Sequence, residues 1–122
     1  MKVIDTKNAP AAIGPYSQAY EVCGLVITSG QIPVDPATGT APEGIEAQAE
    51  QSCKNVKAIL EAAGVSMDKV VKTTCFIADM GDFAKFNEVY AKYFTGKPAR
   101  SCVAVKTLPK NLLCEIEAIA EK

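Results

Sequence analysis

Two stretches of the chain carry apolar residues at the three- and four-residue spacing of an amphipathic helix, and they restrict the possible folds most. The first runs over residues 45–63 and is followed by Gly64, which is suited to end a helix. The second runs over roughly residues 82–95, with Asp79 and Asp82 as candidate N-caps and an aromatic residue about once per turn. Two helices of this length leave more than half of the chain to other structure.

Most of the remaining chain is rich in β-branched and aromatic residues, which favour strands. Residues 16–22 and 25–29 flank Cys23-Gly24 and predict a hairpin. Residues 70–78 predict a strand between the two helices. Residues 101–107 and 112–120, joined by the short connection 108–111, predict a second hairpin. The predicted order is therefore strands, helix, strand, helix, strands.

This order predicts an α+β fold with both helices on one face of a single sheet, because two helices cannot cover both faces. The length of 122 residues and the 48% hydrophobic content suit one domain over residues 1–122. The second sheet face would expose more apolar surface than a monomer normally tolerates. We therefore expect a homo-oligomer in which this face is covered.

Composition excludes several classes of chemistry. The chain has no histidine, so Ser–His–Asp triads, Cys–His dyads and nearly all catalytic zinc sites are impossible. Its five cysteines are widely spread and include no C-x-x-C pair, which predicts neither a disulfide framework nor a metal site. Reduced thiols of this kind fit the cytoplasm.

The charge balance makes nucleic acid an unexpected partner. The formal net charge is −1 and the isoelectric point is about 5.4, so the cationic excess that drives binding to phosphate backbones is missing. No window approaches the roughly 18 apolar residues of a membrane span, and the first residues lack the pattern of a signal peptide. We expect no membrane partner and a cytoplasmic location.

The strand after Pro98 carries the candidate binding chemistry. Its period of two places Arg100 and Cys102 on one face, and the same alternation places Glu115 and Glu117 together on the last strand. If these strands pair through the 108–111 connection, Cys102 lies roughly opposite Glu115, with Arg100 nearby. A guanidinium binds a carboxylate through two parallel hydrogen bonds, which predicts a site for a small acid.

The residues alone allow a second interpretation of each position. Arg100 and Glu115 or Glu117 could form an ordinary cross-strand ion pair. Cys102 could be a small buried hydrophobe, since no base accompanies it. Purely structural or solvated roles are also open for the remaining candidates, which are Tyr16, Ser29, Gly30 and Asn87.

Four segments resemble one known family over essentially the whole chain. They are Asn8-Ala9-Pro10-Ala11-Ala12-Ile13-Gly14-Pro15-Tyr16-Ser17-Gln18, Ile27-Thr28-Ser29-Gly30-Gln31-Ile32-Pro33, Pro98-Ala99-Arg100-Ser101-Cys102-Val103 and Glu115-Ile116-Glu117-Ala118-Ile119-Ala120. Together they resemble the RidA family, also called the YjgF/YER057c/UK114 family. The resemblance implies a chorismate-mutase-like α+β fold with a single mixed sheet, a homotrimer, and sites between subunits.

The resemblance also implies an activity that needs no cofactor. It implies hydrolysis of reactive short 2-imino acids and their enamines, such as 2-aminoacrylate and 2-iminobutanoate, to 2-keto acids and ammonia. The family's carboxylate-binding arginine falls on Arg100, its neighbouring thiol on Cys102, and the acid that positions the attacking water on Glu115. Its remaining catalytic or substrate-binding positions fall on Tyr16, Ser29, Gly30 and Asn87.

The chain departs from the family pattern at residues 94–98, where many members have a longer loop, often with an aromatic residue before the proline. Here the loop is short and includes Lys97, an added cation near the acid-binding end. Two other functions stay open. One is a regulatory trimer that binds 2-keto acids in the same cleft without turnover. The other is the RNA cleavage or translation inhibition ascribed to some relatives, which the acidic isoelectric point disfavours.

Overall fold

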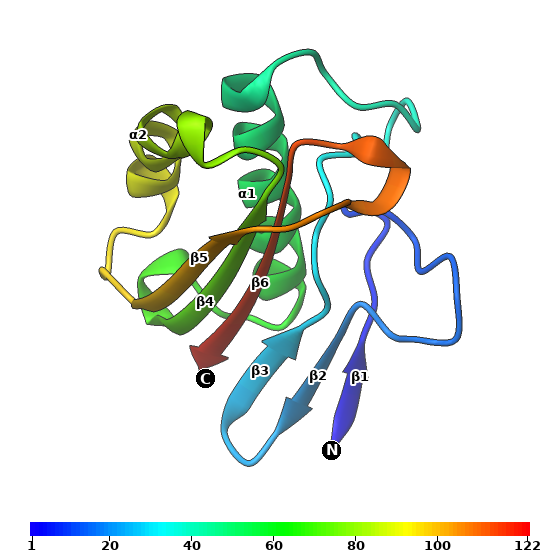
Figure 1. The fold of residues 1–122 in the computed structure, drawn as a ribbon. Coiled ribbons are helices and arrows are strands. Elements are labelled where there is room, and N and C mark those ends of the chain that lie inside the picture. Colours follow the sequence, from blue (N-terminus) through cyan, green and yellow to red (C-terminus); the bar gives the residue numbers. More distant parts are fainter.

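The computed structural model describes residues 1–122, with two α-helices packed on a single sheet (Figure 1). The helices are α1 (Ile45–Ala62) and α2 (Phe83–Tyr93). Three short 3₁₀ helices cover Met67–Lys69, Met80–Asp82 and Pro109–Asn111. The strands are β1 (Lys2–Ile4), β2 (Ala19–Val22), β3 (Leu25–Thr28), β4 (Val70–Ile77), β5 (Ala99–Ala104) and β6 (Cys114–Glu121).

Local sequence signals located most of these elements correctly. The hairpin of β2 and β3 is confirmed, and Gly64 follows the end of α1 with a φ of 76°, a conformation that glycine adopts freely. Asp79 caps the short 3₁₀ helix before α2 by accepting from the Gly81 amide, whereas Asp82 makes no capping bond. Strand β1 lies in a segment that was not predicted to be a strand, because three residues carry too little pattern.

The strand order is β1-β2-β3-β6-β4-β5, in which β4 and β5 are parallel and the other pairs are antiparallel. The sheet is therefore mixed, as the resemblance implied. The predicted hairpin between residues 101–107 and 112–120 is wrong, because β4 lies between β5 and β6. The physical reason is the crossover through α2, which returns the chain to the end of the sheet where β4 began and so makes β5 a parallel neighbour of β4.

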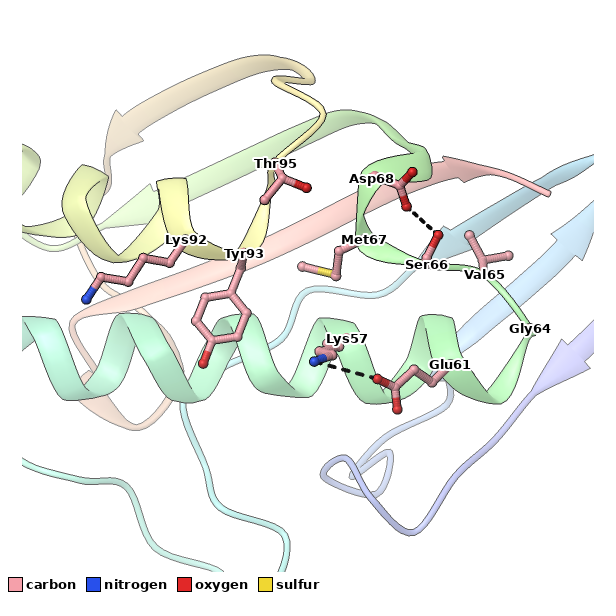
Figure 2. A pocket seen from close by; sticks show the side chains of 10 residues that line it. All are labelled: Lys57, Glu61, Gly64, Val65, Ser66, Met67, Asp68, Lys92, Tyr93 and Thr95. Atoms are coloured by element: carbon pink, nitrogen blue, oxygen red, sulfur yellow. Dashed lines mark hydrogen bonds and ion pairs between the residues drawn. The ribbon is translucent and has the colours of Figure 1, made fainter.

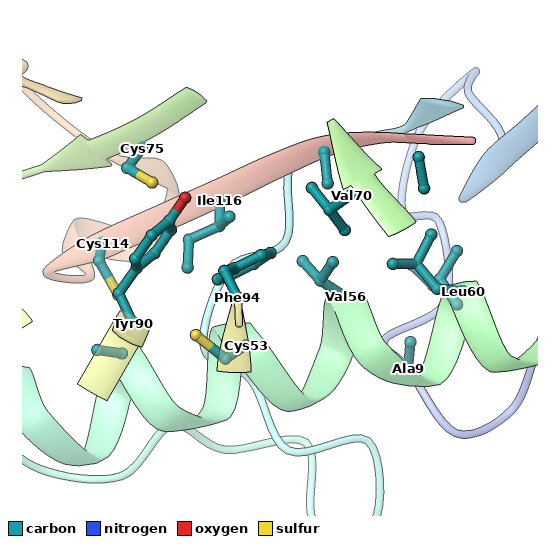
Figure 3. Packing of buried hydrophobic residues seen from close by; sticks show 14 of the residues in the cluster. Ala9, Cys53, Val56, Leu60, Val70, Cys75, Tyr90, Phe94, Cys114 and Ile116 are labelled. Atoms are coloured by element: carbon teal, nitrogen blue, oxygen red, sulfur yellow. The ribbon is translucent and has the colours of Figure 1, made fainter. Parts of the chain in front are cut away.

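The hydrophobic core lies between the helices and one face of the sheet (Figure 3). Val56, Ile59 and Leu60 of α1 are completely buried there, as are Cys75 of β4 and Ile116 of β6. Burial alternates along β4 and β6, so each strand presents one face to the helices and the other away from them. Both helices thus cover the same face, and the prediction of an α+β fold with helices on one side is confirmed.

Two buried amides fix the loops that precede and follow β2 and β3. Gln18 accepts from the Thr6 amide at 2.7 Å and donates to the Pro10 carbonyl at 2.8 Å, which ties down the N-terminal loop. Asn55 of α1 donates to the carbonyls of Ile32 and Val34 at 3.0 and 2.9 Å. The loops on either side of the β2–β3 hairpin are therefore held to the rest of the molecule.

The sheet face away from the helices keeps a row of apolar side chains accessible. Val3, Tyr20 and Ile27 are paired across β1, β2 and β3, and Ile119 continues the row on β6. The first three are 51%, 37% and 40% exposed. No helix covers this row, and no helix of the chain has the length and apolar character needed to span a membrane.

Candidate functional site

Arg100 is the only arginine of the chain, and it lies on the edge strand β5 with its side chain against α2. Its register partner is the buried Thr73 of β4, whose hydroxyl is bonded to that of Tyr90. The guanidinium carbon stands 4.7 Å from the centre of the Tyr90 ring and 5.4 Å from that of Phe83. One guanidinium nitrogen donates to the Asn87 Oδ1 at 2.8 Å. Two rings and one amide therefore fix the orientation of this cation.

The spacing of these α2 residues explains how the helix holds the guanidinium. Phe83, Asn87 and Tyr90 follow one another at four and three residues, so their side chains share one helix face. Of the aromatic residues that recur about once per turn here, Phe86 and Phe94 are buried in the core. The roles of Phe83 and Tyr90 beside Arg100 were missed, although their spacing around Asn87 was visible in the sequence.

No carboxylate pairs with Arg100. The ion pairs of the molecule join Lys57 to Glu61 and Lys122 to Glu21, so the alternative of an ordinary cross-strand ion pair is wrong within one chain. Asn87 occupies one of five guanidinium N–H donors, and the others have no protein partner. A half-buried cation with this many free donors suits an anionic ligand.

Cys102 follows Arg100 on the same face of β5 and is half-buried. Burial raises the pKa of its thiol, and the Arg100 charge opposes that rise. No base stands beside it, so the thiol stays protonated near neutral pH and suits the wall of a site better than a nucleophile. No group of three or more histidine, cysteine, aspartate or glutamate side chains in the structure could hold a metal ion.

Glu115 lies on β6 with its side chain on the sheet face away from the helices, between the buried Cys114 and Ile116. It is half-buried, and this burial raises the pKa of its carboxyl, with a smaller contribution from the charge of Glu117. Gly30 lies directly against it: a Cβ added to Gly30 would stand 2.8 Å from the Glu115 Cδ. The carboxylate is thus packed on bare backbone.

Ser29 and Tyr16 belong to the neighbouring loops. The Ser29 hydroxyl donates to the Ser17 carbonyl at 2.6 Å, and Tyr16 is 49% exposed with its hydroxyl accepting from the Ile13 amide at 3.2 Å. Tyr16 and Gly30 line one cavity of about 440 Å³. Gln31 lines it too, and its buried Oε1 has no hydrogen-bond partner.

The candidate residues therefore form two groups on opposite faces of the sheet. Arg100 aligns with Thr73 on the helix-covered face, whereas Glu115 aligns with Phe76 on the other face. The expected closeness of Cys102 and Glu115 is wrong within one chain, because it rested on direct pairing of β5 with β6. We call Arg100, Asn87 and Cys102 the arginine group, and Glu115, Gly30, Ser29 and Tyr16 the glutamate group.

Another cavity of the molecule contains none of these residues. It measures about 600 Å³ and lies between α1, the first 3₁₀ helix and the end of α2 (Figure 2). Its lining contains two lysines, Lys57 and Lys92, and two acids, Glu61 and Asp68. Lys57 pairs with Glu61 at 3.9 Å, and the Asp68 carboxylate accepts from Ser66. The charges inside it are balanced, so it offers no anion site.

Fold and site together define a class: a small α+β domain with a fixed, unpaired arginine at the sheet edge and a half-buried glutamate on the opposite face. The family model described as endoribonuclease L-PSP matches residues 6–122. A curated relative from Salmonella typhimurium, named 2-iminobutanoate/2-iminopropanoate deaminase, is 57% identical over 123 residues that cover 98% of this chain and 96% of the relative. The chain belongs to the L-PSP family, which confirms the resemblance to RidA.

Solved structures agree with this assignment. The structure titled Escherichia coli TdcF with bound serine is 50% identical, has a TM-score of 0.97, and is matched over 100% of this chain and 99% of its own. The structure titled the YjgF gene product from Escherichia coli is 53% identical and has a TM-score of 0.96. It is matched over 100% of this chain and 99% of its own. The whole fold is thus shared with these two relatives.

Proposed function

We propose that this protein hydrolyses short 2-imino acids, such as 2-iminobutanoate and 2-aminoacrylate in its imine form, to 2-keto acids and ammonia. The observation that carries the proposal is the fixed guanidinium of Arg100, which has free donors and no carboxylate partner. Relatives that are 57% and 55% identical over nearly the full chain bear the name of this activity. A 2-imino acid supplies the carboxylate that such a guanidinium binds.

The reaction needs little from the protein beyond orientation and one proton acceptor. A protonated imine carbon is already electrophilic, so water adds to it while a carboxylate accepts a proton from that water. Glu115 fills this role, because burial raises the pKa of its carboxyl and so makes it a better base than an ordinary glutamate. That proton then passes to the nitrogen, the adduct's hydroxyl group gives its own proton to the carboxylate as the carbonyl forms, and the carbon–nitrogen bond breaks to release ammonia.

The other candidates complete the substrate pocket. Arg100 binds the carboxylate and Asn87 positions Arg100. Cys102 lines the pocket, main-chain groups near Cys102 and at Ser29 and Gly30 hold the nitrogen end, and Tyr16 closes the site and relays a proton. These roles follow the family pattern.

The two groups belong together only if two chains contribute to one site. A ligand that reaches Arg100 approaches over the free edge of β5, while Glu115 lies on the far face of the same sheet. Burying the row of Val3, Tyr20 and Ile27 against another copy supplies a driving force for assembly. The proposal is a homotrimer with the arginine group of one chain facing the glutamate group of the next.

A coupled assay tests the activity. A dehydratase generates 2-iminobutanoate in place, and its decay is followed with and without the protein. Acceleration that Arg100→Ala abolishes supports the proposal, and no acceleration by the wild-type protein contradicts it.

The main alternative is a trimer that binds 2-keto acids for regulation without turnover. Because the chain has one arginine, a dicarbonyl reagent that modifies arginine reports on Arg100 alone, and a bound 2-keto acid protects it. Protection of the wild-type protein without imine turnover favours the regulatory function. Turnover that Glu115→Gln removes while protection persists favours the enzyme.

RNA cleavage is the activity named in the description of the family model. The isoelectric point of about 5.4 and the lack of histidine make it the weaker candidate here. RNA binding that weakens steeply with salt would support it, and negligible binding at low salt would dismiss it.

A further inference from the structure

A separate cavity of about 380 Å³ opens beside Arg100 at the end of α2. Asn87 and Tyr90 line it on the helix side, and Phe94, Lys97 and Pro98 line it along the turn into β5. No aspartate or glutamate is among its lining residues. Its volume falls in the range of small-ligand sites. It contains two cations, Arg100 and Lys97, and the carboxylate next to the imine carbon binds only Arg100.

The turn that carries Lys97 is held in place by close packing. Gly96 lies so near the Asp68 carbonyl that a Cβ there would stand 2.6 Å from the oxygen. The Lys97 amide donates to the Phe94 carbonyl at 3.3 Å, and Lys97 itself has a φ of 51°, a conformation that glycine usually supplies. The backbone at Lys97 is therefore fixed beside the cavity by its neighbours.

The charge balance of this cavity favours a second negative group. Neither Arg100 nor Lys97 has a carboxylate within ion-pair distance. The carboxyl end of α2, at Tyr93, contributes about half a negative charge to this region, which offsets only part of two full cations. After one ligand carboxylate has bound Arg100, a net positive charge remains at Lys97.

We infer that the Arg100 cavity accepts 2-imino acids with a second, distal carboxylate, Arg100 binding the carboxylate next to the imine carbon and Lys97 the distal one. This inference rests on the proposed function and specifies its substrate class. Lys97 is exposed, so its interaction with the distal carboxylate is partly screened by water. The preference for diacids is therefore modest and fades as salt is added.

The experiment compares two imines of matched length, generated from their amino acids by an amino-acid oxidase. One is a four- or five-carbon 2-imino diacid. The other keeps the carboxylate next to the imine carbon but ends in an uncharged methyl group, and we call it the neutral imine after that side chain. The measured quantity is the ratio of kcat/KM for the diacid to kcat/KM for the neutral imine. Lys97→Gln removes the positive charge at nearly constant side-chain length, whereas Lys97→Arg keeps the positive charge. Lys92→Gln is the matched control, since Lys92 lies on α2 but lines the other, charge-balanced cavity.

Lys97→Gln is expected to lower the ratio about three- to fivefold, while Lys97→Arg and Lys92→Gln keep it within a factor of about 1.5. Added salt should lower the wild-type ratio toward that of Lys97→Gln. An unchanged ratio in Lys97→Gln, or a wild-type protein that hydrolyses the neutral imine but not the diacid, overturns the inference and leaves the proposed function standing. A wild-type protein that hydrolyses neither of the two imines overturns the proposed function instead. Thermal melting of each variant confirms that it is folded.

Discussion

Replacing Arg100 by lysine keeps the charge at this position and removes the planar fork of donors. In the structure the guanidinium is oriented by the Asn87 amide at 2.8 Å and by the Tyr90 ring at 4.7 Å, which leaves donors free to bind both oxygens of a carboxylate. Lysine presents a compact ammonium that neither stacks in the same way nor forms two parallel bonds. The variant therefore separates charge from geometry.

The size of the effect follows from the bonds lost. Each charge-assisted hydrogen bond contributes about 1.5–3 kcal/mol. Losing one of two should lower kcat/KM for 2-iminobutanoate about 10- to 150-fold in Arg100→Lys. Losing both should cost about 3–6 kcal/mol in Arg100→Ala, at least about a further tenfold.

The assay is the coupled imine decay, with the dehydratase in excess so that imine hydrolysis limits the rate. Thermal unfolding of both variants checks that the fold persists. An Arg100→Lys protein within threefold of the wild-type kcat/KM would refute the two-bond binding of the carboxylate. If Arg100→Lys and Arg100→Ala lose the same factor in kcat/KM, a positive charge at residue 100 contributes nothing without the geometry of the guanidinium.

Three further predictions test the surroundings of the site. Gly30→Ala places a Cβ 2.8 Å from the Glu115 Cδ, so the carboxylate must move, and kcat/KM should fall at least about tenfold while the melting temperature changes little. Asn87→Ala frees the guanidinium and should lower kcat/KM about tenfold, mostly through KM, as steady-state kinetics will report. Because the pKa of Glu115 is raised, its protonation, and with it the loss of activity, begins at a higher pH than for an ordinary glutamate. The same raised pKa means that ionised Glu115 destabilises the fold, so Glu115→Gln should raise the melting temperature at neutral pH. The difference in melting temperature between variant and wild type should narrow as the pH falls toward the unfolded-state pKa near 4.5. A Glu115→Gln protein that melts lower at pH 7 would contradict this sign.

The sequence predicted individual elements better than their pairing. The helical period of residues 45–63 and the turn at Cys23-Gly24 are local signals, and the structure reproduces both. The placement of β4 between β5 and β6 depends on a crossover, and the short 108–111 connection suggested a hairpin instead. The strand-helix-strand order of β4, α2 and β5 was the better guide to pairing.

The candidate site shows the same division. The alternation around Arg100 correctly placed Cys102 on its face, and that of Glu115 correctly grouped it with Glu117. Their relation across the sheet was wrong because, through Cys75 of β4, Cys102 aligns with Ile116 and not with Glu115. A difference of one residue in register places Glu115 on the opposite face. The packing of Gly30 against Glu115 has no local sequence signature, since it joins a loop to a distant strand.

Mixed assemblies of two inactive variants test most directly whether two chains form one site. Arg100→Ala and Glu115→Gln chains, each inactive alone, are unfolded together and refolded, or coexpressed, in equal amounts. If the arginine group of one chain faces the glutamate group of another, about a quarter of the sites receive both intact groups, and about a quarter of the wild-type imine hydrolysis returns. If one chain supplies the whole site, no activity returns, and the account of a shared site is wrong.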